Sequence, residues 1–98
     1  MPRAVLPSRA VHTTKRFEKD VALAKKRHKD TQKLRGAIDL LVARRNPLPP
    51  ALKDHPLSGD WKGYRDLHLE PDWVLIYKVD DANLWLVRTG SHADLFGS

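Results

Sequence analysis

Apolar residues recur at helical spacing in two stretches of the first half of the chain. Phe17, Val21, Ala24 and His28 form one stripe and predict a helix from Thr13 or Thr14 to about His28. A second stripe follows the cap-type residues Asp30 and Thr31, at Leu34, Ala37, Ile38, Leu41 and Val42. The short junction between them predicts an antiparallel helical hairpin.

The second half of the chain changes to strand patterns. Three strands are predicted at about 62–68, 73–79 and 84–89, with turns at Pro71 and at 80–83, and a short opening strand is predicted at 9–13. Connections this short require antiparallel hairpins. The predicted fold class is therefore α+β: a small antiparallel sheet with a helical hairpin packed on one face and the other face open. Four of the seven prolines lie in 46–60, which reads as a long loop containing His55.

The length of 98 residues fits a single domain, residues 1–98. The chain has no cysteine, so neither a disulfide nor a Cys-based zinc site can form. No apolar stretch reaches the roughly 20 residues of a membrane span, and the start lacks the apolar segment of a secretion signal. We expect a cytoplasmic protein with no membrane partner.

Charge is distributed unevenly along the chain. Residues 1–50 contain 13 basic and 4 acidic residues, whereas residues 51–98 contain 5 and 8. A basic half is typical of a surface that meets a polyanion, although a solvated helix face gives the same pattern. On the predicted first helix, the lysines opposite the apolar stripe are the candidate RNA contacts: Lys15, Lys19, Lys26 and Lys29.

Candidate chemistry gathers at the ends of elements in the second half. His55, His68 and His92 all lie there, together with Asp72 and Arg88. By alternation, His68 shares a strand face with Tyr64 and Asp66, and Arg88 shares one with Leu84 and Leu86. If these two faces coincide, His68 and Arg88 point into one concave surface.

These residue types fit RNA cleavage without a metal. A base takes the proton of a ribose 2′-OH, the oxygen attacks the adjacent phosphate, and an acid protonates the leaving 5′-oxygen; histidine suits either task. Arginine can stabilise the charged phosphate oxygens. Trp73 and Phe96 could stack on unpaired bases, but Trp73 fits a core position equally well. No close pair of metal ligands, nucleophile elbow or phosphate-binding loop is present, so we expect no metal and no cofactor.

At these positions the sequence resembles a known family. The segments KDHPLSGDWKGYRDLHLEPDWVLIYKV and RTGSHADLF resemble the YafQ branch of the RelE-like toxins of bacterial type II toxin–antitoxin systems. The resemblance covers about residues 13–97 and leaves residues 1–12 as an N-terminal extension and first-strand region.

The resemblance implies a small sheet backed by two helices, and a ribosome-dependent endoribonuclease that cuts messenger RNA in the A site. It implies a cognate antitoxin that covers the site in a heterotetramer. It carries functional roles to His55, His68, Asp72, Trp73, Arg88, His92 and Phe96. We assign His92 as general acid, His68 with Asp72 to the base side, His55 as an assisting group and Arg88 to the scissile phosphate. The alternatives are a non-catalytic RNA-binding module and an inactive member kept for partner binding.

Overall fold

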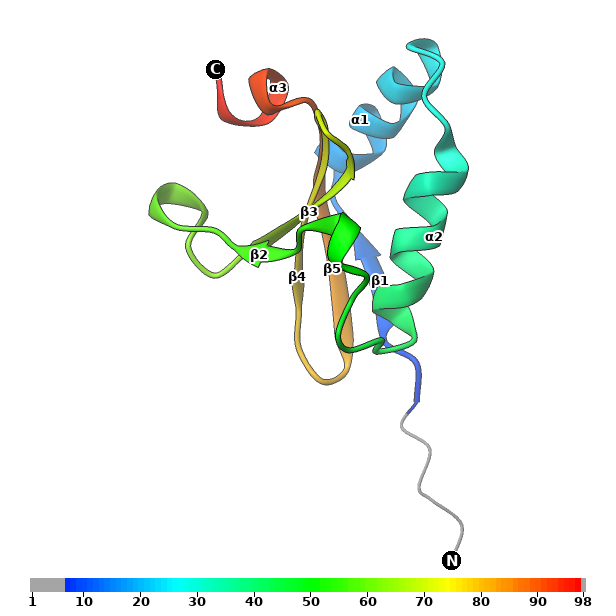
Figure 1. The fold of residues 1–98 in the computed structure, drawn as a ribbon, viewed down its shortest axis with the longest axis vertical. Coiled ribbons are helices and arrows are strands. Elements are labelled where there is room, and N and C mark those ends of the chain that lie inside the picture. The colour runs from blue at the N-terminus through cyan, green and yellow to red at the C-terminus, as the bar shows by residue number, and fades with distance from the viewer. Residues whose placement is uncertain (1–6, 98) are drawn as a thin grey trace, which may run out of the picture.

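Five strands form one sheet at the centre of the molecule (Figure 1). The structure is a computed structural model that describes residues 7–97. The strand order is β1-β5-β4-β3-β2, for β1 (Ala10–Thr13), β2 (His55–Pro56), β3 (Arg65–Glu70), β4 (Trp73–Val79) and β5 (Asn83–Gly90). The α+β class, the opening strand and the three later strands are confirmed. The sheet is mixed rather than purely antiparallel, because β1 runs parallel to β5.

The predicted helical hairpin covers one face of this sheet (Figure 1). In α1 (Lys15–Lys26) the Thr14 side chain caps the first turn by accepting the N–H of Phe17 at 2.9 Å. In α2 (Thr31–Val42) the Asp30 carboxylate does the same for Gln32 at 3.0 Å. The first helix ends two residues before the predicted His28, whose left-handed φ of 59° breaks the helical path.

The main core lies between the hairpin and the sheet. Both apolar stripes face the sheet and meet side chains from β3, β4 and β5, with Val21, Ile38 and Val42 only partly buried. His28, predicted as the last member of the first stripe, is exposed and lies beyond the end of α1. The buried set is Phe17, Ala24, Leu34, Ala37, Leu41, Leu67, Trp73, Leu75, Tyr77, Leu84 and Leu86. The hairpin therefore fixes the sheet's helix-facing side and leaves the other side for the site.

The opposite face is partly covered rather than open. A short helix that the sequence did not predict, α3 (His92–Phe96), packs Leu95 against Val74 and Ile76. In Figure 1 it lies across the sheet from α1 and α2, near the end of the chain. A Ser91–Asp94 capping box starts this helix, with the Asp94 N–H donating to the Ser91 hydroxyl at 3.0 Å. The box places His92 at the first helical position.

The proline-rich segment 46–60 is only partly the loop that was predicted. It contains two single-turn helices, Pro50–Leu52 and Gly59–Trp61, with β2 between them. The Asp54 carboxylate accepts hydrogen bonds from the Arg65 guanidinium, at 2.8 Å from Nη2, and from the Tyr77 hydroxyl. These bonds hold the segment against the sheet, so that His55 pairs with Asp66 of β3.

A bulge in β5 changes which side chains face the histidines. Ile76 pairs with Arg88, but the next residue, Tyr77, pairs with Leu86, so Val87 is the extra residue. Leu86 lies in the core under the helices, and Val87 packs on the opposite face. Simple alternation therefore fails between Leu86 and Arg88.

Two further predictions concern a membrane span and the N-terminal extension. No helix within residues 7–97 is long and apolar enough to cross a membrane. Of the predicted N-terminal extension, residues 1–6 lie outside the described part of the chain, while residues 10–12 belong to β1.

Candidate active site

Three histidines from three different elements form a row beside the sheet. His55 comes from β2, His68 from β3 and His92 from the first position of α3. The ring centroids of His55 and His68 are 6.1 Å apart, and those of His68 and His92 are 5.4 Å apart. Phe96 extends the row, with its ring 6.1 Å from that of His92. The structure thus brings together four of the residues predicted from sequence.

At one end of the row, the backbone orients His55. Its Nδ1 atom lies 2.9 Å from the Lys53 carbonyl oxygen, which can only accept, so Nδ1 carries a proton. The free Nε2 atom then holds a lone pair in the neutral ring. That is the state a general base requires.

A buried carboxylate lies beneath the same ring, and the sequence analysis gave it no role. Asp66 is only 3% exposed, and its Oδ1 atom lies 3.0 Å from His55 Nδ1. This is an ion-pair distance, but Oδ1 has no aligned hydrogen-bond donor among the described residues. Burial raises the pKa of Asp66, and the nearby His55, His68 and His92 oppose that shift. The available signal was its position two residues before His68, on the same strand face.

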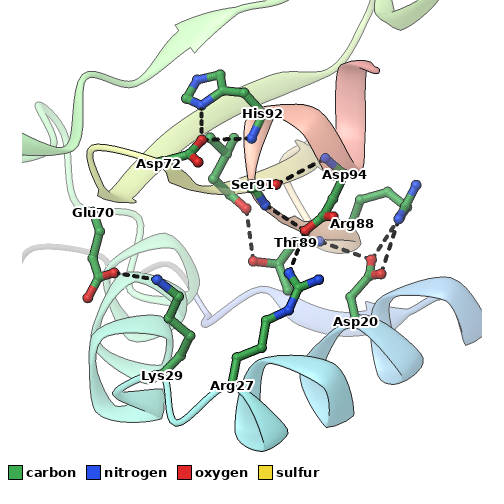
Figure 2. A network of polar contacts seen from close by, with 11 residues as sticks. Asp20, Arg27, Lys29, Glu70, Asp72, Arg88, Thr89, Ser91, His92 and Asp94 are labelled. Atoms are coloured by element: carbon green, nitrogen blue, oxygen red, sulfur yellow. Dashed lines mark hydrogen bonds and ion pairs between the residues drawn. The ribbon is translucent and has the colours of Figure 1, made fainter. Parts of the chain in front are cut away.

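At the other end of the row, Asp72 orients His92. Asp72 Oδ1 lies 2.6 Å from His92 Nδ1 and also accepts the His92 backbone N–H at 2.9 Å, as Figure 2 shows. The backbone bond, followed by the side-chain bond, lowers the pKa of Asp72. Asp72 was assigned with His68 to the base side, but in the structure it contacts His92. It is His92 that has a carboxylate on Nδ1, which leaves Nε2 free to meet a substrate.

Arg88 does not point at the histidine row. Its Nε and Nη2 atoms donate to the two carboxylate oxygens of Asp20, at 2.8 and 3.1 Å, and Asp20 also accepts the Thr89 N–H (Figure 2). The bond to Asp20 raises the pKa of Arg88. The register pairs Arg88 with Ile76, and Ile76 with Asp66, so Arg88 lies on the histidine side of the sheet, but Asp20 holds its guanidinium away from the row. Arg88 does share a cavity of about 370 Å³ with Asp72.

The two residues predicted to stack on bases differ in their exposure to solvent. Trp73 is 1% exposed and packs in the core, so the prediction that it stacks on a base is wrong in this structure. Phe96 is 36% exposed and keeps a surface on which a base could stack. Another tryptophan, Trp61, is half-buried against Val74, Ile76 and Leu95, and no role was predicted for it from the sequence.

The four candidate lysines fall into two groups by their ion pairing. Lys29 forms an ion pair of 2.9 Å with Glu70, which pairs with Lys33 as well, and the two lysine bonds lower the pKa of Glu70. Lys29 is therefore occupied within the protein. The remaining three are exposed on α1, and no carboxylate within residues 7–97 lies at ion-pair distance from them: Lys15, Lys19 and Lys26.

A protein metal site needs several acidic, histidine or cysteine side chains that converge on one point. In the part of the chain that the structure describes, no three of them converge closely enough to hold an ion. The arrangement is instead suited to proton transfer. Two oriented histidines stand at the ends of a row, with a third between them.

Known proteins are similar to this chain in sequence and in fold. The model of a family described as "Bacterial toxin of type II toxin-antitoxin system, YafQ" matches residues 9–97. The mRNA interferase toxin YafQ of Escherichia coli strain K12 is 55% identical over 89 residues, which cover 91% of this chain and 97% of that protein.

Solved structures agree. The crystal structure of YafQ from E. coli strain BL21(DE3) has a TM-score of 0.88 at 54% identity, covering 91% of this chain and 99% of that one. YafQ in the E. coli DinJ–YafQ toxin–antitoxin complex gives a TM-score of 0.86 at 54% identity, covering 92% and 99%. A family match across nearly the whole chain, with the same fold in its relatives, shows that this chain belongs to the YafQ family of type II toxin–antitoxin toxins.

Proposed function

We propose that this chain is an endoribonuclease that cuts messenger RNA in the ribosomal A site by metal-independent acid–base transfer. The observation that carries the proposal is the orientation of the two outer histidines. His55 is held through Nδ1 by a carbonyl, and His92 is held through Nδ1 by Asp72. Each therefore presents Nε2, one as a proton acceptor and the other as a donor.

The reaction follows from this arrangement. His55, with His68 beside it, takes the proton from the 2′-OH, and the oxygen attacks the adjacent phosphorus. The bond from phosphorus to the 5′-oxygen breaks while His92 Nε2 protonates the leaving oxygen. The products are a 2′,3′-cyclic phosphate and a free 5′-OH. Attack by a neighbouring hydroxyl is intramolecular, so no metal-bound hydroxide is required.

Two further residues bind the message in this proposal, and three lysines bind ribosomal RNA. Arg88 contacts the scissile phosphate through Nη1, because Asp20 occupies Nε and Nη2 and so fixes the guanidinium plane. Phe96 stacks on an unpaired base next to His92. Lys15, Lys19 and Lys26 contact ribosomal RNA from the exposed side of α1.

The proposed partners follow from the relatives. One E. coli relative has been crystallised as the DinJ–YafQ toxin–antitoxin complex. We infer that a cognate antitoxin covers the site of this chain in a two-plus-two assembly, in the cytoplasm where ribosomes are found. A neighbouring reading frame encoding a small acidic protein would support this inference.

Purified protein tests the function directly. We expect it to cut a message positioned in the A site of a 70S ribosome and to leave the same message intact when no ribosome is present. Efficient cutting of the free message would contradict ribosome dependence. Ribosome binding with no cutting of any message would favour the non-catalytic alternative.

The same ribosome sample tests whether the lysines of α1 contribute to ribosome binding. Reversing Lys19 and Lys26 to glutamate should weaken ribosome association most at low salt. Reversing Arg35 and Arg45 to glutamate, two exposed arginines on α2 and just after it, changes the charge by the same amount and is the matched control. An equal loss in both proteins would mean that net charge, rather than the α1 surface, determines binding.

Asp66→Asn should stabilise the protein and slow the reaction. The raised pKa means that folding favours protonated Asp66, so stability is lost as pH rises from about 3.8 through the folded pKa. At neutral pH the asparagine variant avoids this loss and should unfold at a higher temperature. Cleavage should fall at least about 10-fold, because His55 loses the charge beneath its ring.

Thermal unfolding across a pH series and single-turnover cleavage measure the two effects. The stability difference should grow from about pH 4 to neutrality. An Asn variant that is less stable than the parent at neutral pH would show that the histidines stabilise the Asp66 charge fully. Unchanged cleavage would remove Asp66 from the site.

A further inference from the structure

A second groove lies on the histidine side of the sheet, between the start of α1, β5 and the turn Gly59–Trp61. Its volume is about 380 Å³. Its lining is Thr14, Arg16, Trp61, Val87 and Arg88. Trp61, Val87 and Arg16 have no role in the proposed cleavage reaction.

Trp61 is held firmly in this wall. Its ring meets that of Tyr64 edge to face, with centroids 5.5 Å apart and planes at 88°. Its backbone N–H donates to the Ser58 carbonyl at 3.3 Å, and its carbonyl accepts the Tyr64 N–H at 3.0 Å. The ring is half-buried rather than covered, so an ordered aromatic surface borders the groove.

The rest of the lining is apolar and positively charged. The bulge turns Val87 into the groove, and the Thr14 hydroxyl fixes that strand by donating to the Val87 carbonyl at 2.8 Å. Arg16 is exposed, and no carboxylate within residues 7–97 lies at ion-pair distance from it. No acidic residue lines the groove. An aromatic ring beside a free arginine suits a base joined to a phosphate.

The groove borders the candidate active site. Arg88 lines it on one side and, on the other, lines the cavity that contains Asp72. Trp61 packs in the same cluster as Leu95 of α3, the helix that begins with His92. A nucleotide in the groove would therefore be joined to the scissile phosphate by a short length of RNA.

We propose that this groove is a subsite for one unpaired nucleotide of the message, next to the cut. The base stacks on Trp61, its phosphate pairs with Arg16, and Arg88 separates this nucleotide from the scissile phosphate. The proposal rests on the proposed function in that the RNA is the message. The binding step itself can be measured without cleavage.

The probe is a short RNA carrying a 2′-O-methyl group at every position, which can bind but cannot be cut. Titration of this RNA into the 15N-labelled protein reports on each tryptophan through its indole N–H signal. The signal of Trp61 should shift on binding, whereas that of Trp85, which is stacked on His12 of β1, should not follow it. Trp61→Ala should weaken binding about 10-fold, the range for one stacked base, and Trp61→Phe should retain most of it.

Arg16→Ala should lower the slope of log affinity against log salt by about 0.7, because one phosphate contact is lost from a single strand. Arg35→Ala, on the exposed side of α2, should leave the slope unchanged. Unfolding curves establish that each variant folds.

Binding that shifts other signals but leaves Trp61 unmoved would overturn the proposal, and so would the absence of any binding at millimolar RNA. Loss of antitoxin binding in Trp61→Ala with RNA binding intact would assign the groove to the antitoxin instead. A Trp61 shift in a protein that cuts no message would uphold the subsite while rejecting the proposed nuclease.

Discussion

Replacing His92 with alanine should reduce cleavage of ribosome-bound message by about 10²–10⁴-fold, the usual contribution of one general acid or base. Ribosome binding should persist, because the change removes one partly exposed ring at the start of α3. The expectation rests on the fixed Nδ1 of His92, which Asp72 holds at 2.6 Å. Removing the ring removes the only histidine whose Nε2 we assign to the leaving oxygen.

His12→Ala is the matched control. His12 lies on β1, stacked on Trp85 at 5.5 Å and hydrogen-bonded to Asn83, and it has no role in the proposed reaction. Single-turnover cleavage and ribosome co-sedimentation of both variants give the comparison. A His92→Ala protein that cuts at the parental rate would remove His92 as the acid. Equal losses in both variants would point to a general effect on stability.

The helices and the main core follow from sequence periodicity because each pattern depends on local spacing. The stripe containing Phe17 and Ala24 and the stripe containing Leu34 and Leu41 both face the sheet, as predicted. The strand β4 is buried on both sides, as its continuous apolar run indicates. His55 and His92 begin β2 and α3, at element ends as predicted, whereas His68 lies inside β3, two residues before its end.

The predictions about Asp72 and Arg88 failed because they depend on contacts between segments that are far apart in the sequence. Asp72 is 20 residues from His92, and only the close approach of the β3–β4 turn to the capped start of α3 brings them together. The Arg88 guanidinium is held by Asp20, which is 68 residues away along the chain. The spacing of residues along the sequence therefore identifies neither contact partner.

Burial also decided two assignments that residue type left open. Trp73 is a core residue and Asp66 a buried charge, although the sequence pattern suggested a role in RNA binding for the first and none for the second. A tryptophan beside an apolar strand fits both positions. The role of a buried carboxylate can be judged only when its environment is known, because the free-energy cost of burying its charge depends on the charges around it.

The most direct test of the mechanism is a single 2′-deoxy substitution at the nucleotide before the cut, in a message held in the A site. It removes the attacking oxygen and changes little else. Cutting should stop, and ribosome and message binding should be nearly unchanged. The unsubstituted message should give a 2′,3′-cyclic phosphate, or its 3′-phosphate hydrolysis product, and a free 5′-OH, and it should do so after EDTA pretreatment that preserves the ribosome. A 5′-phosphate product, or efficient cutting of the deoxy message, would show attack by water and contradict transfer to the 2′-OH.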